Sequence, residues 1–176
     1  TYGSMSNDDN NFSFEPEAYR QSVHNNPDNR SLFKLAMGGQ EFVRGLIRPM
    51  LYLTPTSNLS ADQTKEFQKV FEKIKSYRST SKRAATQKLA EKPQYFAEPR
   101  DRTGFKVFVP QVLSGRRNFV TAGFLEDRYL VIAPHMQIIN KPIYCLAIIS
   151  SSLHLIWIAT VCGKLKTDFR YSNTLG

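Results

Sequence analysis

Cysteine, histidine and catalytic signatures are scarce in this sequence, and each scarcity excludes a class of protein. The chain has two cysteines, Cys145 and Cys162, and three histidines, too few and too widely spaced for a Cys/His zinc site. It contains neither a nucleotide-binding glycine loop nor a hydrolase nucleophile elbow. We therefore expect buried, reduced thiols acting as small hydrophobic groups, and no catalytic residue, metal or cofactor in this chain.

Long apolar runs are also rare, and the one present is interrupted. Residues 143–162 are long enough for a helix that crosses a bilayer, but three consecutive serines at 150–152 and then His154 break the run. A serine in this position favours the start of a new helix. We predict two helices buried in the core and no membrane partner. The polar, acidic start of the sequence lacks a signal-peptide pattern, which favours a cytoplasmic location.

Positive charge, in contrast, is abundant and local. The net charge is +9 and the sequence pI is about 9.7. Between Lys65 and Arg117 there are fourteen basic and five acidic residues, whereas the rest of the chain carries ten of each. The simplest explanation is a solvated surface helix. Because charge spread for solubility would not be so concentrated, we favour a basic surface for a polyanionic partner.

The patterning predicts one α+β domain, with a mixed, largely antiparallel sheet packed by helices. The clearest helix begins at Ser60, which has capping-box spacing to Gln63 and is followed by an apolar face of Phe67, Val70, Phe71 and Ile74. Other helices are predicted at 15–23, at 81–91 and in the pair that ends at Gly163. Strands are predicted at 42–53, 105–113, 117–125 and 128–136.

Two segments have the chemistry to contact nucleic acid. In the predicted helix 81–91, the small residues Ala84 and Ala85 would let the backbone come close to a partner while basic and amide side chains project. Around residue 115, a predicted strand–turn–strand would present arginine and asparagine to a groove. Arginine binds guanine, and asparagine or glutamine binds adenine, through paired hydrogen bonds. The side chains concerned are Lys82, Arg83, Gln87 and Lys88 in the first segment, and Arg116, Arg117 and Asn118 in the second.

Three blocks, at 81–100, 109–125 and 150–175, closely resemble the target recognition domain of MmeI-like DNA methyltransferases, which are single-polypeptide restriction-modification enzymes. The last block resembles the family pattern at Ser151, Ser152, His154, Trp157, Val161, Cys162, Gly163, Lys166, Asp168, Arg170, Tyr171 and Ser172. The resemblance covers nearly the whole chain. It implies an N-terminal arm and connecting segment at 1–40 and a target recognition domain at 41–176.

The resemblance implies that the chain recognises a sequence in double-stranded DNA and presents an adenine to the methyltransferase domain of the same parent chain. That domain would methylate the exocyclic N6 amine with S-adenosylmethionine. The catalytic motifs are absent here, so we expect the fragment itself not to be an enzyme. The chain stops just after Asn173, before the aromatic–proline segment that usually continues the family, which suggests an isolated domain of a larger protein.

The resemblance also adds Ser114 and Gly115 to the base-reading region, although Gly115 stands where a charged residue is expected. The full set of predicted DNA contacts is Arg78, Lys82, Arg83, Gln87, Lys88, Ser114, Gly115, Arg116, Arg117 and Asn118. Cys162, Gly163 and residues 170–172 are expected to serve packing or domain docking. Two alternatives stay open: a general nucleic-acid-binding module without sequence preference, and a protein-docking module of a larger enzyme.

Overall fold

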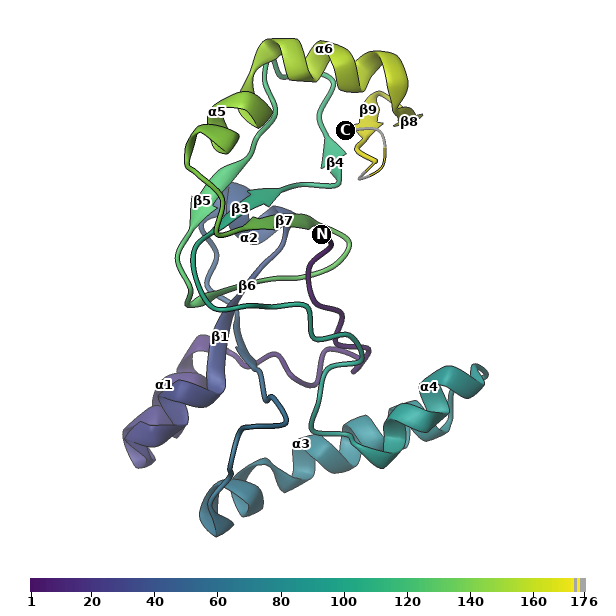
Figure 1. The fold of residues 1–176 in the computed structure, drawn as a ribbon. Helices are drawn as coiled ribbons and strands as arrows, with labels where there is room; N and C mark the ends of the chain where they lie inside the picture. Colours follow the sequence, from purple (N-terminus) through teal and green to yellow (C-terminus); the bar gives the residue numbers. More distant parts are fainter. Residues whose placement is uncertain (173, 175–176) are drawn as a thin grey trace. The chain divides into compact units, whose positions relative to one another are not determined.

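The chain forms two compact units, which are described separately here. The computed structural model describes residues 1–172 and Thr174. Asn173 and residue 175, at the end of the third family block, lie outside the described residues, as does residue 176. Unit 1 comprises residues 1–3, 37–43 and 101–176, and unit 2 comprises residues 4–36 and 44–100. Each unit combines helices with antiparallel strands (Figure 1), so the predicted α+β class is confirmed. The proposed division at residue 40 stays a prediction.

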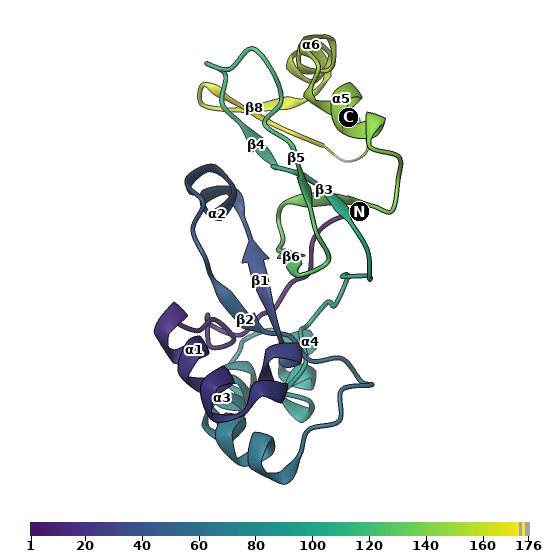
Figure 2. The same ribbon diagram turned by 90° about the vertical axis from the view of Figure 1, so that its left-hand side faces the viewer.

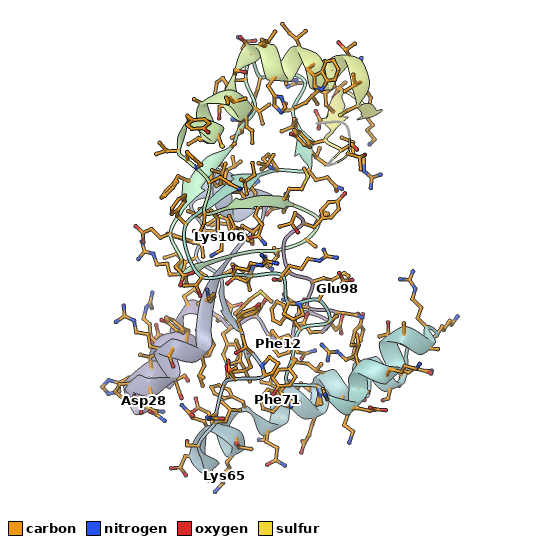
Figure 3. The ribbon with its side chains drawn as sticks, viewed as in Figure 1. Phe12, Asp28, Lys65, Phe71, Glu98 and Lys106 are labelled. Atoms are coloured by element: carbon orange, nitrogen blue, oxygen red, sulfur yellow. The ribbon has the colours of Figure 1, made fainter. Side chains whose placement is uncertain are left out.

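Unit 2 is mainly helical. It contains α1 (Pro16–Asn25), the 3-10 helix η1 (Pro27–Leu32), β1 (Phe33–Met37), β2 (Pro49–Leu51), α3 (Ala61–Ser79), α4 (Ala84–Lys88) and the 3-10 helix η2 (Leu89–Glu91), with Met37 assigned to unit 1. β1 and β2 are antiparallel, with Phe33 opposite Leu51. Phe12, which Figure 3 labels, is buried in its core together with Phe67 and Phe96. The rings of Phe12 and Phe96 lie 5.0 Å apart.

Helix α3 follows directly from its sequence. The Gln63 backbone N–H donates to Ser60 Oγ (3.2 Å), and the Ser60 backbone N–H donates to Gln63 Oε1 (2.9 Å), so the predicted capping box is present. Phe67 and Ile74 are buried. The lysines of the helix, Lys65, Lys69, Lys73 and Lys75, are all exposed, as the amphipathic pattern predicts.

A polar network centred on the buried Asn29 connects α3 to the preceding helices. Asn29 is fully buried; its amide donates to Glu66 Oε2 (2.9 Å) and its Oδ1 accepts from Gln63 Nε2 (2.9 Å). The Ser22 hydroxyl donates to the other oxygen of Glu66 (2.5 Å). Because each of these polar groups has a partner, the network positions α1 and η1 on α3 without leaving an unsatisfied group.

The strand predicted at 42–53 is wrong over most of its length. Residues Gly39–Arg44 form helix α2, which crosses from unit 1 into unit 2, and only Pro49–Leu51 is strand. The Gly38 backbone N–H donates to the Glu41 carboxylate (3.0 Å), which stabilises the first helical turn. Gly45 has φ +67° and ends the helix in the left-handed conformation that glycine adopts without strain.

Unit 1 contains most of the strands. These are β3 (Lys106–Val109), β4 (Val112–Leu113), β5 (Gly123–Leu125), β6 (Tyr129–Val131), β7 (Met136–Ile139), β8 (Gly163–Leu165) and β9 (Asp168–Arg170), with α5 (Tyr144–Ser150) and α6 (Ser152–Val161) between β7 and β8. One antiparallel sheet has the order β5-β3-β7 and another has the order β4-β9-β8. Residues 1–3 join β7: the Gln137 backbone N–H donates to the Thr1 carbonyl (2.8 Å).

The strand–turn–strand predicted around residue 115 is wrong. β4 pairs with β9, from the C-terminal part of the chain, and β5 pairs with β3, so residues 114–122 form a loop between two sheets. Leu113 and Val120, on either side of the turn, are both buried in one apolar cluster. The loop is therefore tied down by side-chain packing at both ends instead of by a hairpin ladder.

The helical pair is present, but the prediction that it is buried is wrong. The His154 backbone N–H donates to Ser151 Oγ (3.1 Å), so the predicted cap separates α5 from α6. Ile158 is buried, whereas Leu153, Ile156 and Trp157 are 76%, 63% and 54% exposed. Because α6 is apolar on all sides, packing one stripe of it into the core leaves the others exposed. Figure 2 shows α6 nearly end-on.

Membrane-spanning length was assessed over residues 1–172 and Thr174. No single helix there is long and apolar enough to cross a bilayer. The pair α5 and α6, bent by 55°, reaches the required length and composition together.

Candidate nucleic-acid interface

The structure divides the predicted DNA contacts into two clusters. Those at 78–88 belong to unit 2, and those at 114–118 belong to unit 1. The basic stretch that is continuous in the sequence is therefore two local surfaces. Each surface has to be judged by the exposure and the hydrogen bonds of its own side chains.

Arg78 is not available to DNA, and its assignment as a DNA contact is corrected. Its side chain is fully buried at the C-terminal end of α3. Its Nε donates to the Asn7 carbonyl (3.0 Å); Nη1 donates to Leu89 and Lys92 carbonyls (3.1 and 3.2 Å), and Nη2 donates to Ser6 and Tyr95 carbonyls (2.9 and 2.8 Å). These five bonds use all five N–H groups of a guanidinium. Burial lowers the pKa of Arg78, and the negative charge of Asp8 opposes this.

Lys82, Arg83, Gln87 and Lys88 are exposed beside this buried arginine. The Arg83 backbone N–H donates to Ser81 Oγ (3.2 Å), and the Gln87 amide donates to the Ser81 carbonyl (2.8 Å). These bonds hold the turn that leads into α4, which is shorter than the predicted helix 81–91 because Ser81–Arg83 form this turn. Ala84 and Ala85 are exposed as well, so no bulky side chain blocks an approach to the backbone here.

A cavity of about 600 Å³ opens beside the same turn. It is lined by Tyr77, Lys82, Arg83, Ala85 and Glu98, among others. Tyr77 is 40% exposed, and sequence reasoning missed it because aromatic residues were assigned to the core. Its position five residues before the exposed Lys82–Arg83 pair was the available signal. An aromatic ring in a cavity that is also lined by cations offers a stacking surface for a base in addition to phosphate contacts.

The unit 1 cluster is a tight, exposed turn. The Arg117 backbone N–H donates to the Ser114 carbonyl (3.2 Å), and the Arg116 N–H donates to Ser114 Oγ (3.4 Å). Arg116, Arg117 and Asn118 are exposed, and Phe119 is 52% exposed. The structure thus brings the predicted arginines and asparagine together, although on a loop and not on a hairpin.

Gly115 has a structural role that explains why no charged residue stands there. A Cβ at this position would lie 2.2 Å from the Thr167 carbonyl oxygen, a separation that no side chain can adopt without a backbone shift. The Gly115 N–H also donates to Asp168 Oδ1 (3.3 Å). The turn is therefore held against the β8–β9 connection by a close approach that only glycine permits.

A largely apolar cavity of about 390 Å³ lies next to this turn, within unit 1. Its lining includes Ser114, Arg117, Phe42, Phe108 and His135, and the Phe42 and Phe108 rings stack at 4.7 Å. His135 Nε2 accepts from the Gly39 backbone N–H (3.0 Å). Burial lowers the pKa of His135, and the charge of Glu41 opposes this. His135 Nε2 therefore acts as a hydrogen-bond acceptor, and the lowered pKa favours the neutral ring.

Three residues of the third family block, His154, Cys162 and Tyr171, lie together. The Tyr171 hydroxyl lies 3.0 Å from His154 Nε2, and Cys162, Tyr171 and Ile158 belong to the same buried cluster. Burial lowers the pKa of His154 and raises that of Tyr171, with Cys162 adding to the latter. Packing or domain docking is the role expected of Cys162 and Tyr171, and the burial of both in this cluster supports packing. Cys145 is only partly buried, in contrast to the expectation.

The chemistry of these surfaces is that of binding. Within residues 1–172 and 174, no group of three or more His, Cys, Asp or Glu side chains is arranged to hold a metal ion. Exposed arginine, lysine and asparagine on short, well-fixed turns, with an aromatic ring beside each, are the features of an α+β domain that contacts nucleic acid through loops.

Comparison with known proteins agrees with this class. The family model described as "MmeI, target recognition domain" matches residues 1–176, so the chain belongs to the family of MmeI target recognition domains. It is 29% identical over 171 residues to DNA methyltransferase A of Bacillus subtilis (strain 168), covering 97% of this chain and 20% of that protein.

A solved structure is similar over the same length. The Type IIL restriction-modification enzyme MmeI in complex with DNA matches 99% of this chain with a TM-score of 0.88 and 25% identity, over 23% of the enzyme. The chain thus spans about a fifth of the length of the relatives that it matches. The resemblance inferred from the three sequence blocks is confirmed.

Proposed function

We propose that this chain is the DNA-sequence-reading domain of a restriction-modification methyltransferase. The observation that carries the proposal is the match of the whole chain to MmeI target recognition domains. It is supported by two exposed turns that display cations on short, hydrogen-bonded backbones. The predicted contacts that the structure leaves accessible are Lys82, Arg83, Gln87, Lys88, Ser114, Gly115, Arg116, Arg117 and Asn118.

Within the two turns, different side chains would contact phosphates and bases. Lys82 and Lys88 are point charges suited to phosphates, which provide affinity without sequence preference. Arg83, Arg116, Arg117 and Asn118 carry planar donors that can distinguish bases in the major groove. Gln87 already donates its amide within its own turn, which orients the side chain.

The parent would supply the chemistry that this chain lacks. We infer that a methyltransferase domain in the same polypeptide transfers a methyl group from S-adenosylmethionine to the N6 amine of an adenine. Residues 1–40 would connect the recognition domain to that methyltransferase domain. The reaction would take place in the cytoplasm. The proposal rests on the family resemblance and on the relatives, which are about five times longer than this chain.

Methylation-site mapping in cells that express the full-length parent tests the proposal. Exchange of residues 80–88 and 114–118 for those of a relative with another target should change the methylated motif. If the motif stays the same while total methylation falls, these turns only bind phosphates, and the chain is a general nucleic-acid-binding module without sequence preference.

Single substitutions can distinguish residues that recognise bases from residues that only bind phosphates. Arg83→Ala and Arg117→Ala should weaken discrimination at one base pair each by roughly tenfold or more, whereas Lys82→Ala should weaken binding to all sequences and lower the salt dependence of log Kd by about 0.9. Arg20 and Arg128, both exposed and each paired with a glutamate, are matched controls in units 2 and 1. Alanine at either should change neither property.

A further inference from the structure

The segment Arg44–Arg48, with the sequence RGLIR, is an exposed apolar loop that the proposed function has not used. Leu46 and Ile47 are 49% and 62% exposed, although unit 2 has a well-formed aromatic core. Exposed aliphatic side chains carry a free-energy cost that grows with their area in water. Two of them in succession at one loop, between two arginines, need an explanation.

The loop lies between helix α2 and strand β2, and hydrogen bonds hold its C-terminal end. The Ala36 backbone N–H donates to the Arg48 carbonyl (2.8 Å), and the next residue, Pro49, is paired with Leu35 in the β1–β2 ladder. At the other end, Gly45 adopts φ +67°, and a Cβ there would meet nothing within 4 Å. Glycine is therefore used for its backbone conformation and not to avoid a crowded neighbour. A loop fixed in this way loses little conformational entropy when it binds.

The two arginines on either side of the apolar pair indicate what kind of partner the loop would bind. Arg44 is exposed, and Arg48 is partly buried at the other side of the apolar pair. Stacked bases between two phosphate backbones offer the same alternation of an apolar interior and anionic flanks. Another exposed apolar surface, formed by Leu153, Ile156 and Trp157 on α6, has no charged residue between 143 and 163 and lacks this match to DNA.

We propose that Leu46 and Ile47 form an apolar wedge that inserts at a base step of the bound duplex, with Arg44 on an adjacent phosphate. Proteins that deform DNA insert Leu, Ile, Phe or Met between base pairs, which unstacks the step and bends the helix. The wedge rests on the proposed function, because it requires that this domain binds duplex DNA. It goes beyond that function by naming a DNA-deforming element away from the predicted base-reading turns in the sequence.

The full-length parent and 2-aminopurine test the wedge. A duplex with the target motif carries 2-aminopurine at one position at a time, within and beside the motif; its fluorescence rises where a base becomes unstacked. The wild-type protein should give such a rise at a step that lies apart from the methylated base. Ile47→Ala and Leu46→Ala should reduce that rise at least fivefold and weaken binding roughly tenfold, and Ile47→Met, which keeps a long apolar side chain, should retain both.

Two controls make the result specific. Ile156→Ala removes an isoleucine of equal exposure, 63% against 62%, and should leave the fluorescence unchanged. Arg44→Gln should weaken binding without moving the unstacked step. An unchanged fluorescence pattern in Ile47→Ala, with sequence-specific binding intact, would overturn the wedge and leave the proposed function standing.

Other results would overturn it differently. If Ile47→Ala leaves the fluorescence unchanged but makes the DNA-free parent more sensitive to trypsin, the loop packs against another domain of the protein. If the wild-type parent binds target and unrelated duplexes equally and gives no rise at any position, both the wedge and the sequence-reading function fail.

Discussion

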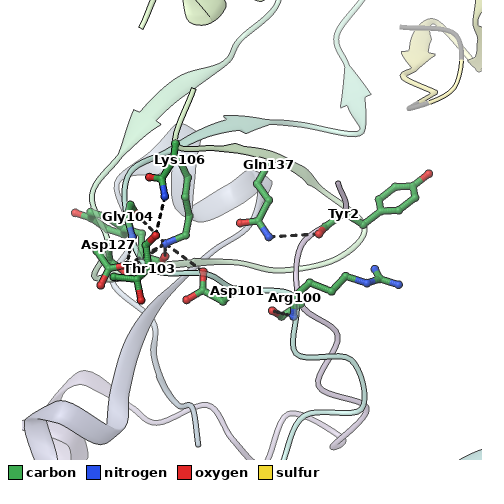
Figure 4. Close-up of polar contacts among 11 residues, drawn as sticks. Tyr2, Arg100, Asp101, Thr103, Gly104, Lys106, Asp127 and Gln137 are labelled. Carbon is green, nitrogen blue, oxygen red and sulfur yellow. Dashed lines mark hydrogen bonds and ion pairs between the residues drawn. The ribbon is translucent and has the colours of Figure 1, made fainter. Parts of the chain in front are cut away.

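Each unit buries one cation completely, and the two are accommodated in different ways. Arg78 in unit 2 gives its N–H groups to backbone carbonyls from residues 6–7, 89–92 and 95. Lys106 in unit 1 lies 3.1 Å from Asp101 and 3.6 Å from Asp127, and also donates to the Tyr129 carbonyl (3.1 Å) (Figure 4). The arginine ties several segments together through its five directed donors, whereas the lysine neutralises carboxylates as a compact charge.

Basic residues that are close in the sequence can therefore have opposite structural roles, one buried in the fold and one exposed on the surface. Arg78 and Arg83 are five residues apart, yet one is fully buried and the other is exposed. The buried Arg78 binds carbonyls of Leu89 and Lys92, which follow the segment from which Arg83 projects. Substitutions at the buried Arg78 and Lys106 should therefore affect different units. The single tryptophan, Trp157, reports on unit 1, whereas helical circular dichroism comes mainly from α1 and α3 of unit 2, with a smaller contribution from α5 and α6 of unit 1.

Loss of Arg78 should have the largest effect. Arg78→Met leaves five carbonyls without their donor and should lower the free energy of unfolding by about 4 kcal/mol, seen in urea as an earlier loss of helical circular dichroism. Arg78→Lys should recover only part of this, because three donors cannot replace five fixed ones. Equal stability of Arg78→Lys and the wild type would show that charge alone, and not the fork of donors, is what matters.

Loss of Lys106 should come next. Lys106→Met leaves the nearly buried Asp101 carboxylate without its cation and should cost about 3 kcal/mol, with the Trp157 fluorescence transition shifted more than the circular dichroism. Adding Asp101→Asn removes the uncompensated charge and should restore part of the loss. A double variant that is less stable than Lys106→Met would contradict this account of the pair.

Removal of the α3 cap should have a smaller effect, limited to unit 2. Ser60→Ala removes the acceptor of the Gln63 N–H and should destabilise unit 2 by about 1 kcal/mol. Urea unfolding followed by circular dichroism measures it, and Ser60→Asp, which keeps an acceptor at the cap, is the matched control. If the alanine variant is as stable as the wild type, tertiary packing alone holds the start of α3.

Acid should weaken unit 1 before unit 2. The pKa values of His135 and His154, both in unit 1, are lowered in the folded state by burial, so below their ordinary value of about 6.5 the unfolded chain binds more protons. Stability from these groups is therefore fully present above that pH and is lost as the pH falls further. His135→Gln and His154→Gln should each flatten the pH dependence of the Trp157 transition between pH 7 and 5; an unchanged slope in both would contradict it.

Substitution of Arg83 should have the smallest effect on stability, because its side chain is exposed whereas that of Arg78 is buried. Arg83→Ala removes only an exposed side chain and should change the free energy of unfolding by less than about 0.5 kcal/mol, while the full-length parent loses affinity or discrimination for its target DNA. A large loss of stability would mean that Arg83, like Arg78, organises the fold.

Local features could be predicted from the sequence because neighbouring residues decide them. The capping box at Ser60, the apolar face of α3, the cap at Ser151 and the exposed cations near 83 and 117 each depend on spacings of a few residues. The three family blocks likewise identified the domain. The hairpin around residue 115 could not be predicted correctly, because the partner of β4 is β9, more than fifty residues further along the chain.

The α+β class, the main helix α3, the clusters of basic residues near 83 and 117 and the family could be predicted from the sequence alone. Only the tertiary structure decided that Arg78 and Lys106 are buried, that Gly115 is required by the Thr167 carbonyl, and that Leu46, Ile47 and much of α6 are exposed. The physical reason is that helix capping and amphipathicity act within a few residues. Burial and strand pairing instead depend on which distant segments supply carbonyls, carboxylates and apolar side chains, and those segments meet only in the folded protein.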